Sequence, residues 1–270
     1  MKPSYSRICP IICTLSRCTL MLLLMGQLGC GKQAVPQDTV TQFAPFDALL
    51  AGLYDGHTSC RELLKHGNLG IGTFDRLEGE MILLDGTVWQ VKADGKVYQP
   101  PLDTKTPFAT VSPFYPEQKI LVDRPLNFAD LQELLDRTIP NPNLFYGLRI
   151  SGTFSLMRTR SVPAQQKPYP PLAEVARNQP VFTMDQVKGT LVGFYCPAYV
   201  KGVNVPGYHL HFITDNFRQG GHVLDFVIAS GQAEIDRYPQ LSLMLPETDE
   251  AFSRVDLSKD RSTDLENAER

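Results

Sequence analysis

Histidine is scarce in this chain, and most of its cysteines lie at the start. There are five histidines among 270 residues, and four of the six cysteines fall within the first thirty positions. Only Cys60 and Cys196 belong to the body of the chain. These two can pair in an oxidising compartment, but they are equally consistent with two buried thiols. Their spacing is not that of a zinc site, so a structural zinc finger is not expected.

The sequence also lacks the charge bias and the motifs of several common function classes. Its formal net charge is -3, and it has no basic stripe with interleaved aromatic residues, so nucleic-acid binding is not expected. It contains no G-x-S-x-G element, P-loop or H-E-x-x-H motif, the signatures of common serine hydrolases, NTPases and metalloproteases. Gly70-Ile71-Gly72 precedes predicted strands rather than a helix, which favours a backbone turn over a dinucleotide loop.

The beginning of the chain has the pattern of an export signal. Basic residues precede an apolar run at 18–25, which is too short to span a bilayer as a stable helix. The Leu-Gly-Cys sequence at 28–30 resembles a lipoprotein cleavage site, although Gln27 stands where leucine is usual. We expect residues 1–29 to be a signal peptide and Cys30 to be the acylated N-terminus of a periplasmic or membrane-anchored protein. The alternative is an ordinary cleaved signal, in which Cys30 is incidental.

Strand signals outnumber helix signals in the rest of the chain and predict an α+β fold. We expect mostly mixed or antiparallel sheets in two packed halves, with few helices. Residues 30–42 are polar and predict a tether, residues 43–165 form a β-rich first half, and residues 166–270 form a second half with a polar tail. Strands are expected at 81–84, 87–91, 144–150, 153–162, 189–195, 209–214 and 222–229, and helices at 126–139, with Asn127 as N-cap, and at 172–177.

Three of the five histidines lie within fourteen residues of one another. His209 and His211 alternate on a predicted strand, so they project from one face while Leu210 and Phe212 face a core. The turn-like segment that follows can fold the next strand back and bring His222 beside them. Three converging imidazoles fit a zinc site with an open fourth position, the catalytic arrangement, and would place that site in the second half. A surface pair, or half-buried histidines with hydrogen-bond partners, is the alternative, and spacing alone does not decide.

Two further pairs of charged residues alternate along predicted strands. Glu78 and Glu80 form one pair, and one of them can point into a site, although a solvated strand face is commoner. Arg158 and Arg160 share a face with Phe154, which suggests that one guanidinium is drawn inward. Arginine is suited to bidentate capture of a carboxylate, whereas exposure at the surface is its usual place.

These features occur together in one known family. Residues 207–214 with 220–224 resemble the zinc-binding signature of the acetolactate decarboxylases. The similarity extends from about residue 43 to the C-terminus, through segments 70–74, 78–81, 105–109, 143–146, 160–163, 167–170 and 189–194. The resemblance implies that the three histidines are zinc ligands. It also implies that Arg160 is the essential arginine, and that Thr73 and Arg160 contact the substrate.

The resemblance further assigns two carboxylates to the site. It places one on Glu80 and the other on Glu269, with Glu266 as the rival position because the tail matches loosely. Either carboxylate can deliver a proton or complete the metal shell. A glutamate that donates a proton near pH 7 needs a raised pKa, from burial or from charge repulsion.

The implied activity is the zinc-dependent conversion of 2-acetolactate to acetoin and carbon dioxide by a homodimer. Acetolactate is a β-keto acid, so the electrons left by its carboxylate can move to the ketone oxygen, with zinc as the Lewis acid. One alternative is a zinc lyase that acts on another 2-hydroxy-3-oxo acid. The other is a non-catalytic, zinc-stabilised envelope protein, which would keep the histidines but would not need Arg160.

Overall fold

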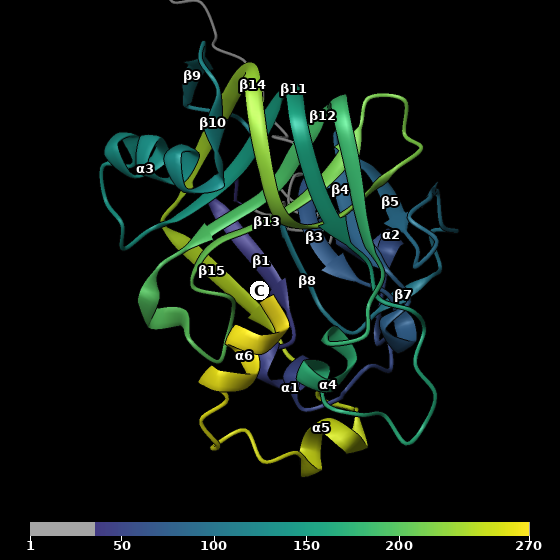
Figure 1. The fold of residues 1–270 in the computed structure, drawn as a ribbon. Helices are drawn as coiled ribbons and strands as arrows, with labels where there is room; N and C mark the ends of the chain where they lie inside the picture. Colours follow the sequence, from purple (N-terminus) through teal and green to yellow (C-terminus); the bar gives the residue numbers. More distant parts are fainter. Residues whose placement is uncertain (1–35, 270) are drawn as a thin grey trace, which may run out of the picture. The chain divides into compact units, whose positions relative to one another are not determined.

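The computed structural model describes residues 36–269 (Figure 1). The predicted signal peptide and Cys30 lie outside the described residues. The expected tether ends earlier than residue 42, because Thr39–Phe43 forms strand β1 and all five of its residues are buried. None of the helices within 36–269 is long and apolar enough to cross a membrane.

The first sheet has seven strands, and it is antiparallel except for the parallel pair at one edge. That edge strand comes from near the end of the chain and lies beside β1, so the sheet joins both ends of the described chain. The strand order is β15 (Gln240–Met244), β1, β8 (Ala109–Ser112), β3 (Leu69–Thr73), β4 (Glu80–Leu84), β5 (Thr87–Val91) and β6 (Val97–Tyr98).

The second sheet contains three long, bent strands (Figure 1). Its last strand, β13, also pairs with β14, so the sheet closes on itself at the end where the chain passes from β13 to β14. The order is β10 (Leu126–Asn127), β14 (Gly220–Tyr238), β11 (Phe145–Arg160), β12 (Val181–Cys196) and β13 (Gly207–Thr214), and β9 (Gln118–Val122) pairs with β14. A small separate sheet joins β2 (Thr58–Ser59) to β7 (Lys105–Thr106).

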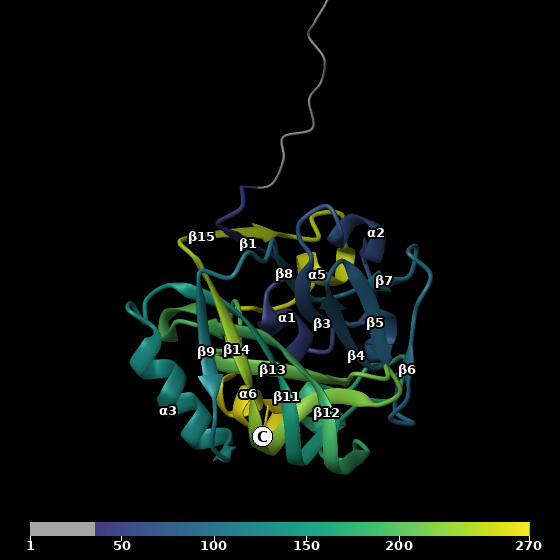
Figure 2. The ribbon, with the colours of Figure 1, turned by 90° about the horizontal axis from the view of Figure 1, so that it is seen from above.

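Six short α-helices and two 3-10 turns complete the described chain. Helix α3 (Phe128–Thr138) packs beside the second sheet, whereas α1 (Phe46–Leu50), α4 (Leu172–Ala176) and α6 (Ser262–Glu269) contact one another (Figures 1 and 2). The remaining elements are α2 (Cys60–Leu63), α5 (Glu250–Arg254), η1 (Asp75–Leu77) and η2 (Ala198–Val200).

Apolar cores lie on both faces of each sheet's central strands. One core fills the space between the two sheets and contains Ile82, Val192 and Ile213. A second lies inside the curved second sheet and under α3. A third joins α1, α4 and α6. Cys60 and Cys196 are buried free thiols in separate cores, so these two residues are not a disulfide pair.

The predicted α+β class, the two packed sheets and the scarcity of helices are confirmed. The Asn127 side chain accepts a hydrogen bond of 2.9 Å from the Asp130 backbone N–H, as expected of the N-cap of α3. The two strands expected between residues 144 and 162 are one continuous strand, β11. The polar tail expected to be irregular forms α5 and α6.

The sheets do not follow the expected division between residues 165 and 166. Strands β10 and β11 precede that point in the sequence, yet they belong to the second sheet. Strand β15 follows it and lies in the first sheet. The described chain is one compact unit, because strands from both parts of the sequence pair within each sheet.

Candidate metal centre and active site

The three histidines come together because two antiparallel strands pair at the end of the second sheet. His211 on β13 is the register partner of His222 on β14, and His222 is in turn opposite Arg160 on β11. Gly221 makes this close approach possible. Its φ is +138°, and a Cβ at this position would lie 2.5 Å from the Arg160 carbonyl oxygen. Any other residue there would push His222 away from its neighbours.

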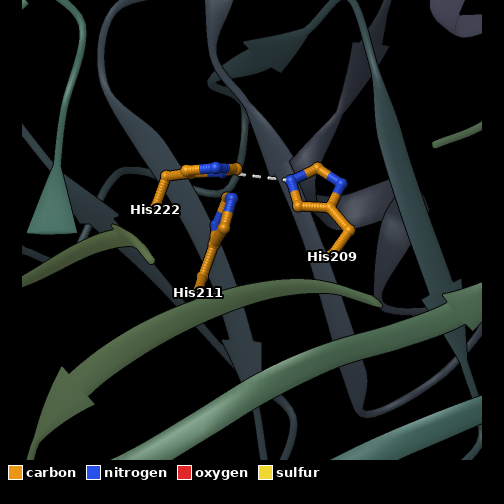
Figure 3. Close-up of side chains that lie close together, drawn as sticks. All are labelled: His209, His211 and His222. Atoms are coloured by element: carbon orange, nitrogen blue, oxygen red, sulfur yellow. Dashed lines mark hydrogen bonds between the residues drawn. The ribbon is translucent and has the colours of Figure 1, made fainter. Parts of the chain in front are cut away.

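The alternation predicted for β13 is confirmed. His209 and His211 are both buried and point into the same space (Figure 3). Leu210 and Phe212 point the other way, into the core inside the second sheet. The local geometry of an extended strand is therefore enough to place two of the three imidazoles side by side.

One nitrogen from each ring lies within 4.8 Å of the corresponding nitrogens of the other two, which makes the group able to hold a metal ion. His209 Nε2 is 3.2 Å from His222 Nδ1 (Figure 3). Tetrahedral coordination with metal–nitrogen bonds of about 2.0–2.1 Å sets two ligand nitrogens about 3.3 Å apart. The spacing of this pair therefore fits a shared metal ion.

The protein backbone fixes the tautomer of the third imidazole. His211 Nδ1 is 2.8 Å from the Met81 carbonyl oxygen on β4. Because a carbonyl only accepts, Nδ1 carries the proton and Nε2 presents its lone pair to the centre. Burial, followed by the Arg160 charge, lowers the pKa of His209 to about 3 and that of His222 well below its ordinary value. The rings are therefore neutral near pH 7, the form that binds a metal.

Two carboxylates from different parts of the fold lie beside the histidines. Glu80 Oε2, on β4 of the first sheet, lies 3.6 Å from His211 Nε2. Glu269 Oε2, at the end of α6, lies 3.6 Å from His209 Nε2 and 3.8 Å from His222 Nε2. Burial raises the pKa of Glu80 to about 8 and that of Glu269 to about 7, against the opposing effect of Arg160. Both groups can therefore hold a proton near neutral pH.

Arg160 reaches the same space and is only 5% exposed. Its Nη2 donates a hydrogen bond to the Ala268 carbonyl oxygen. Its Nε and Nη1 are buried and have no hydrogen-bond partner among the described residues. A buried guanidinium with two unpaired donors is costly unless a ligand supplies the acceptors, and the oxygens of a carboxylate are suitable acceptors.

A pocket connects these groups and encloses about 460 Å³ of space free of protein atoms, part of it open to solvent. Thr73 is one wall of the pocket, and its hydroxyl donates a 2.8 Å hydrogen bond to the Gly79 carbonyl oxygen. Because this hydrogen bond uses the hydroxyl proton, the Thr73 oxygen can act only as a hydrogen-bond acceptor toward a ligand in the pocket. Apolar side chains form much of the remaining lining: Phe46, Leu49, Leu77, Phe108, Val162, Leu172 and Ala176.

All seven residues expected at the site line this one pocket: Thr73, Glu80, Arg160, His209, His211, His222 and Glu269. The rival positions lie elsewhere. Glu78 pairs with Lys92 at 3.0 Å, and Arg158 and Glu266 are exposed. The expectation that one of the two arginines is drawn inward is confirmed, because Arg160 is buried whereas Arg158 is exposed. Strand β11 pairs with β12 without interruption from residue 156 to residue 160, so the two arginines keep the alternation of the strand.

The sequence did not indicate the backbone carbonyls that orient the site or its apolar lining. The Met81 carbonyl holds His211, and the Ala268 carbonyl holds Arg160. Every residue has a carbonyl group, so no residue type marks such a role. Lining residues such as Leu49 and Leu172 belong to short helices whose apolar side chains also fit an ordinary core.

Comparison with solved structures places the chain among the decarboxylases. The crystal structure of alpha-acetolactate decarboxylase from Bacillus subtilis strain 168 matches with a TM-score of 0.84 and 36% identity, over 86% of this chain and 99% of that one. Among curated sequences, the alpha-acetolactate decarboxylase of Methanosarcina mazei is 46% identical over 86% of this chain and 81% of its own length. That of Methylococcus capsulatus is 44% identical over 85% and 88%, respectively.

The family model for alpha-acetolactate decarboxylase matches residues 40–259. The chain belongs to this family, and it is therefore a carboxy-lyase.

Proposed function

We propose that this protein catalyses the zinc-dependent decarboxylation of 2-acetolactate to acetoin and carbon dioxide. The observation that carries the proposal is the convergence, in one buried pocket, of three neutral histidines and an arginine with two unpaired donors. His209, His211 and His222 would hold the zinc ion, which supplies Lewis-acid stabilisation of the charge that develops on oxygen when the carboxylate leaves.

Arg160 binds and orients the substrate carboxylate. Its Nη2 is held by the Ala268 carbonyl, and the Nε and Nη1 donors have no protein partner among the described residues and are available to the substrate. This arrangement fixes the bond that will break relative to the adjacent ketone. Thr73 offers only acceptor lone pairs, which suits a hydrogen bond from the substrate hydroxyl.

Glu80 and Glu269 handle the proton that replaces carbon dioxide. Decarboxylation leaves an electron pair that takes up one proton to form acetoin. Glu80 is buried and the Glu269 side chain is 17% exposed, and both carboxyl groups lie beside the histidines, where each can take up and release a proton. The apolar lining excludes bulk water and holds the substrate methyl groups.

The direct test is acetoin formation from racemic 2-acetolactate, measured before and after treatment with a chelator and again after zinc is restored. We expect acetoin to form, to be lost with the metal and to return with zinc. Absence of acetoin with the fully metallated protein would refute the proposal. A panel of other 2-hydroxy-3-oxo acids would then identify a different zinc lyase, and inertness toward all of them would indicate a non-catalytic envelope protein.

We also propose that the protein is a homodimer. Family membership supports this assembly, and so does β15, an edge strand with apolar side chains at the surface. Leu241 and Leu243 are 37% and 36% exposed, and the adjacent Met244 and Leu245 are 45% and 53% exposed. Sedimentation equilibrium should give twice the chain mass, and Leu243→Lys should shift the protein toward the monomer. A wild-type monomer at micromolar concentration would refute the dimer.

The export pattern at the start of the sequence supports a location outside the cytoplasm. We propose that residues 1–29 are removed and that Cys30 carries a lipid, which makes the protein a periplasmic or membrane-anchored lipoprotein. Expression in a bacterial host should give a membrane-associated product, and Cys30→Ala should change its processing and fractionation. Identical soluble, cleaved products from both versions would favour an ordinary signal and secretion.

A further inference from the structure

The helix that carries Glu269 needs contacts outside itself to keep its position. Helix α6 has eight residues, and an isolated helix of that length is not stable in water. Two of its side chains, Leu265 and Ala268, pack in the core formed with α1 and α4. At its C-terminal end, Arg160 donates to the Ala268 carbonyl. These contacts hold the half of α6 that is nearest to the site.

The other end of α6 is held by a buried arginine. Arg261 directly precedes the helix, and its carbonyl accepts the first-turn hydrogen bond from the Leu265 N–H at 2.9 Å. The Arg261 side chain is 10% exposed, and its Nη1 lies 3.8 Å from Asp47 Oδ2 on α1, whose side chain is 16% exposed. This contact is an ion pair without a hydrogen bond, because Nη1 has no hydrogen-bond partner among the described residues. The Arg261 Nη2 donates a 2.6 Å hydrogen bond to the Asp256 carbonyl. One guanidinium thus joins α1, the preceding loop and the start of α6.

This contact is less exposed than the other lysine and arginine ion pairs of the C-terminal segment described next. Lys201 and Asp260 pair at 3.0 Å, but their side chains are 52% and 71% exposed. Arg254 and Glu250 on α5 pair at 2.8 Å and are 77% and 82% exposed. Exposed pairs contribute little to stability, whereas breaking a buried pair leaves an uncompensated charge.

We propose that Arg261 is a positioning residue, which sets the place of Glu269 at the histidine centre through α6, with Asp47 as its partner. Arg261 and Glu269 are eight residues apart, a distance of about 12 Å at about 1.5 Å per residue. A tilt at the Arg261 end is therefore transmitted to the Glu269 carboxylate. This inference rests on the proposed function in so far as Glu269 takes part in the reaction.

The expected effect is on the rate constant and not on the metal. The three histidines lie on strands, so Arg261→Gln should leave the zinc content unchanged. A displacement of about 1 Å of a reacting group can cost roughly 100-fold in rate. We expect Arg261→Gln to lower kcat by roughly 10- to 100-fold with a small change in KM. Arg261→Lys keeps the charge toward Asp47 and should recover part of the loss.

The experiment compares Arg261→Gln and Asp47→Asn with a matched control, Arg254→Gln, which removes an exposed ion pair from the same segment. Each change is made in the wild type and in a Glu269→Gln background. If Arg261 acts through Glu269, its loss should lower kcat in the wild type but change it by less than about 2-fold when Glu269 is already replaced. The control should leave kcat unchanged in both backgrounds.

A second measurement does not depend on activity. Hydrogen–deuterium exchange of the α6 amides should be faster in Arg261→Gln and Asp47→Asn than in the wild type, and unchanged in Arg254→Gln. Equal losses of kcat in both backgrounds, or unchanged exchange in α6, would overturn the positioning role. Absence of acetoin from the wild type would refute the proposed reaction, whereas the exchange result would still decide whether Arg261 holds the helix.

Discussion

Arg160→Lys is the substitution that most directly tests how the pocket recognises a carboxylate. Lysine keeps the positive charge, but its ammonium group cannot contact the Ala268 carbonyl and also replace the two other donors of the planar guanidinium. In the wild type, Nη2 is used by Ala268, while Nε and Nη1 have no protein partner among the described residues. The substitution should therefore remove two directed donors while leaving the histidines in place.

The magnitude follows from those two donors. A hydrogen bond to a charged group contributes about 1.5–3 kcal/mol, so two of them contribute about 3 kcal/mol or more. A loss of 1.4 kcal/mol lowers a rate tenfold, which predicts a decrease in kcat/KM of roughly 100-fold or more. The positive charge that lysine retains keeps the long-range attraction for the anionic substrate, so the loss reports mainly on geometry.

The assay is acetoin production across a range of acetolactate concentrations, with zinc content and thermal unfolding measured on the same samples. The matched control is Arg158→Lys, because Arg158 lies on the same strand two residues away and is exposed. The control should leave kcat/KM unchanged. Near-normal kcat/KM in Arg160→Lys at full zinc content would refute the role of the Arg160 guanidinium in binding the carboxylate. An equal loss in Arg158→Lys would show that the effect is not specific to Arg160.

Three further predictions concern the metal, the tail and pH. His211→Ala should remove zinc and activity together, and elemental analysis that finds undiminished zinc would contradict its role as a ligand. Glu269→Gln should lower kcat by roughly 10²- to 10⁴-fold, whereas Glu266→Gln should not; equal rates would make the tail a bystander. In the chelated protein, the three histidines, whose pKa values burial lowers, take up protons on unfolding below about pH 6.5. Glu80 and Glu269, with pKa values raised to about 8 and about 7, release protons on unfolding above about pH 4.5. Urea titrations should therefore show a maximal free energy of unfolding at about pH 6. A free energy of unfolding that still rises from about pH 6 to about pH 8 would contradict these pKa shifts.

Some of the site follows from local sequence. The alternation of His209 and His211 was enough to place both rings on one face, because side-chain direction along a strand depends on the backbone of that strand alone. The N-cap at Asn127 and helix α3 were predicted for the same reason. The family resemblance, carried by segments spread over most of the chain, supplied the functional residues that local rules left open.

The position of Arg160 illustrates where local rules stop. Strict alternation puts Arg158 and Arg160 on the same side of β11 as Phe154. The ladder of β11 breaks between Phe154 and Leu156, so Phe154 shares its core with Met157 instead. On the uninterrupted stretch from residue 156 to residue 160, Arg158 is exposed and Arg160 is buried. Arg160 lies opposite His222 and contacts the Ala268 carbonyl of α6, and the sequence of one strand does not reveal such contacts between distant segments.

The family resemblance named the two carboxylates, but local sequence patterns did not, because their positions depend on tertiary structure. Glu80 lies beside His211 because the first sheet packs against the second, although the two residues are far apart in the sequence. Only Leu265 and Ala268 of α6 pack into a core. Two apolar positions are too few to give the polar tail a helical pattern in the sequence. The sequence by itself determined the strands, the paired histidines and the family. Packing between the sheets and the docking of α6 decided which acids face the metal centre, because both depend on contacts between distant segments.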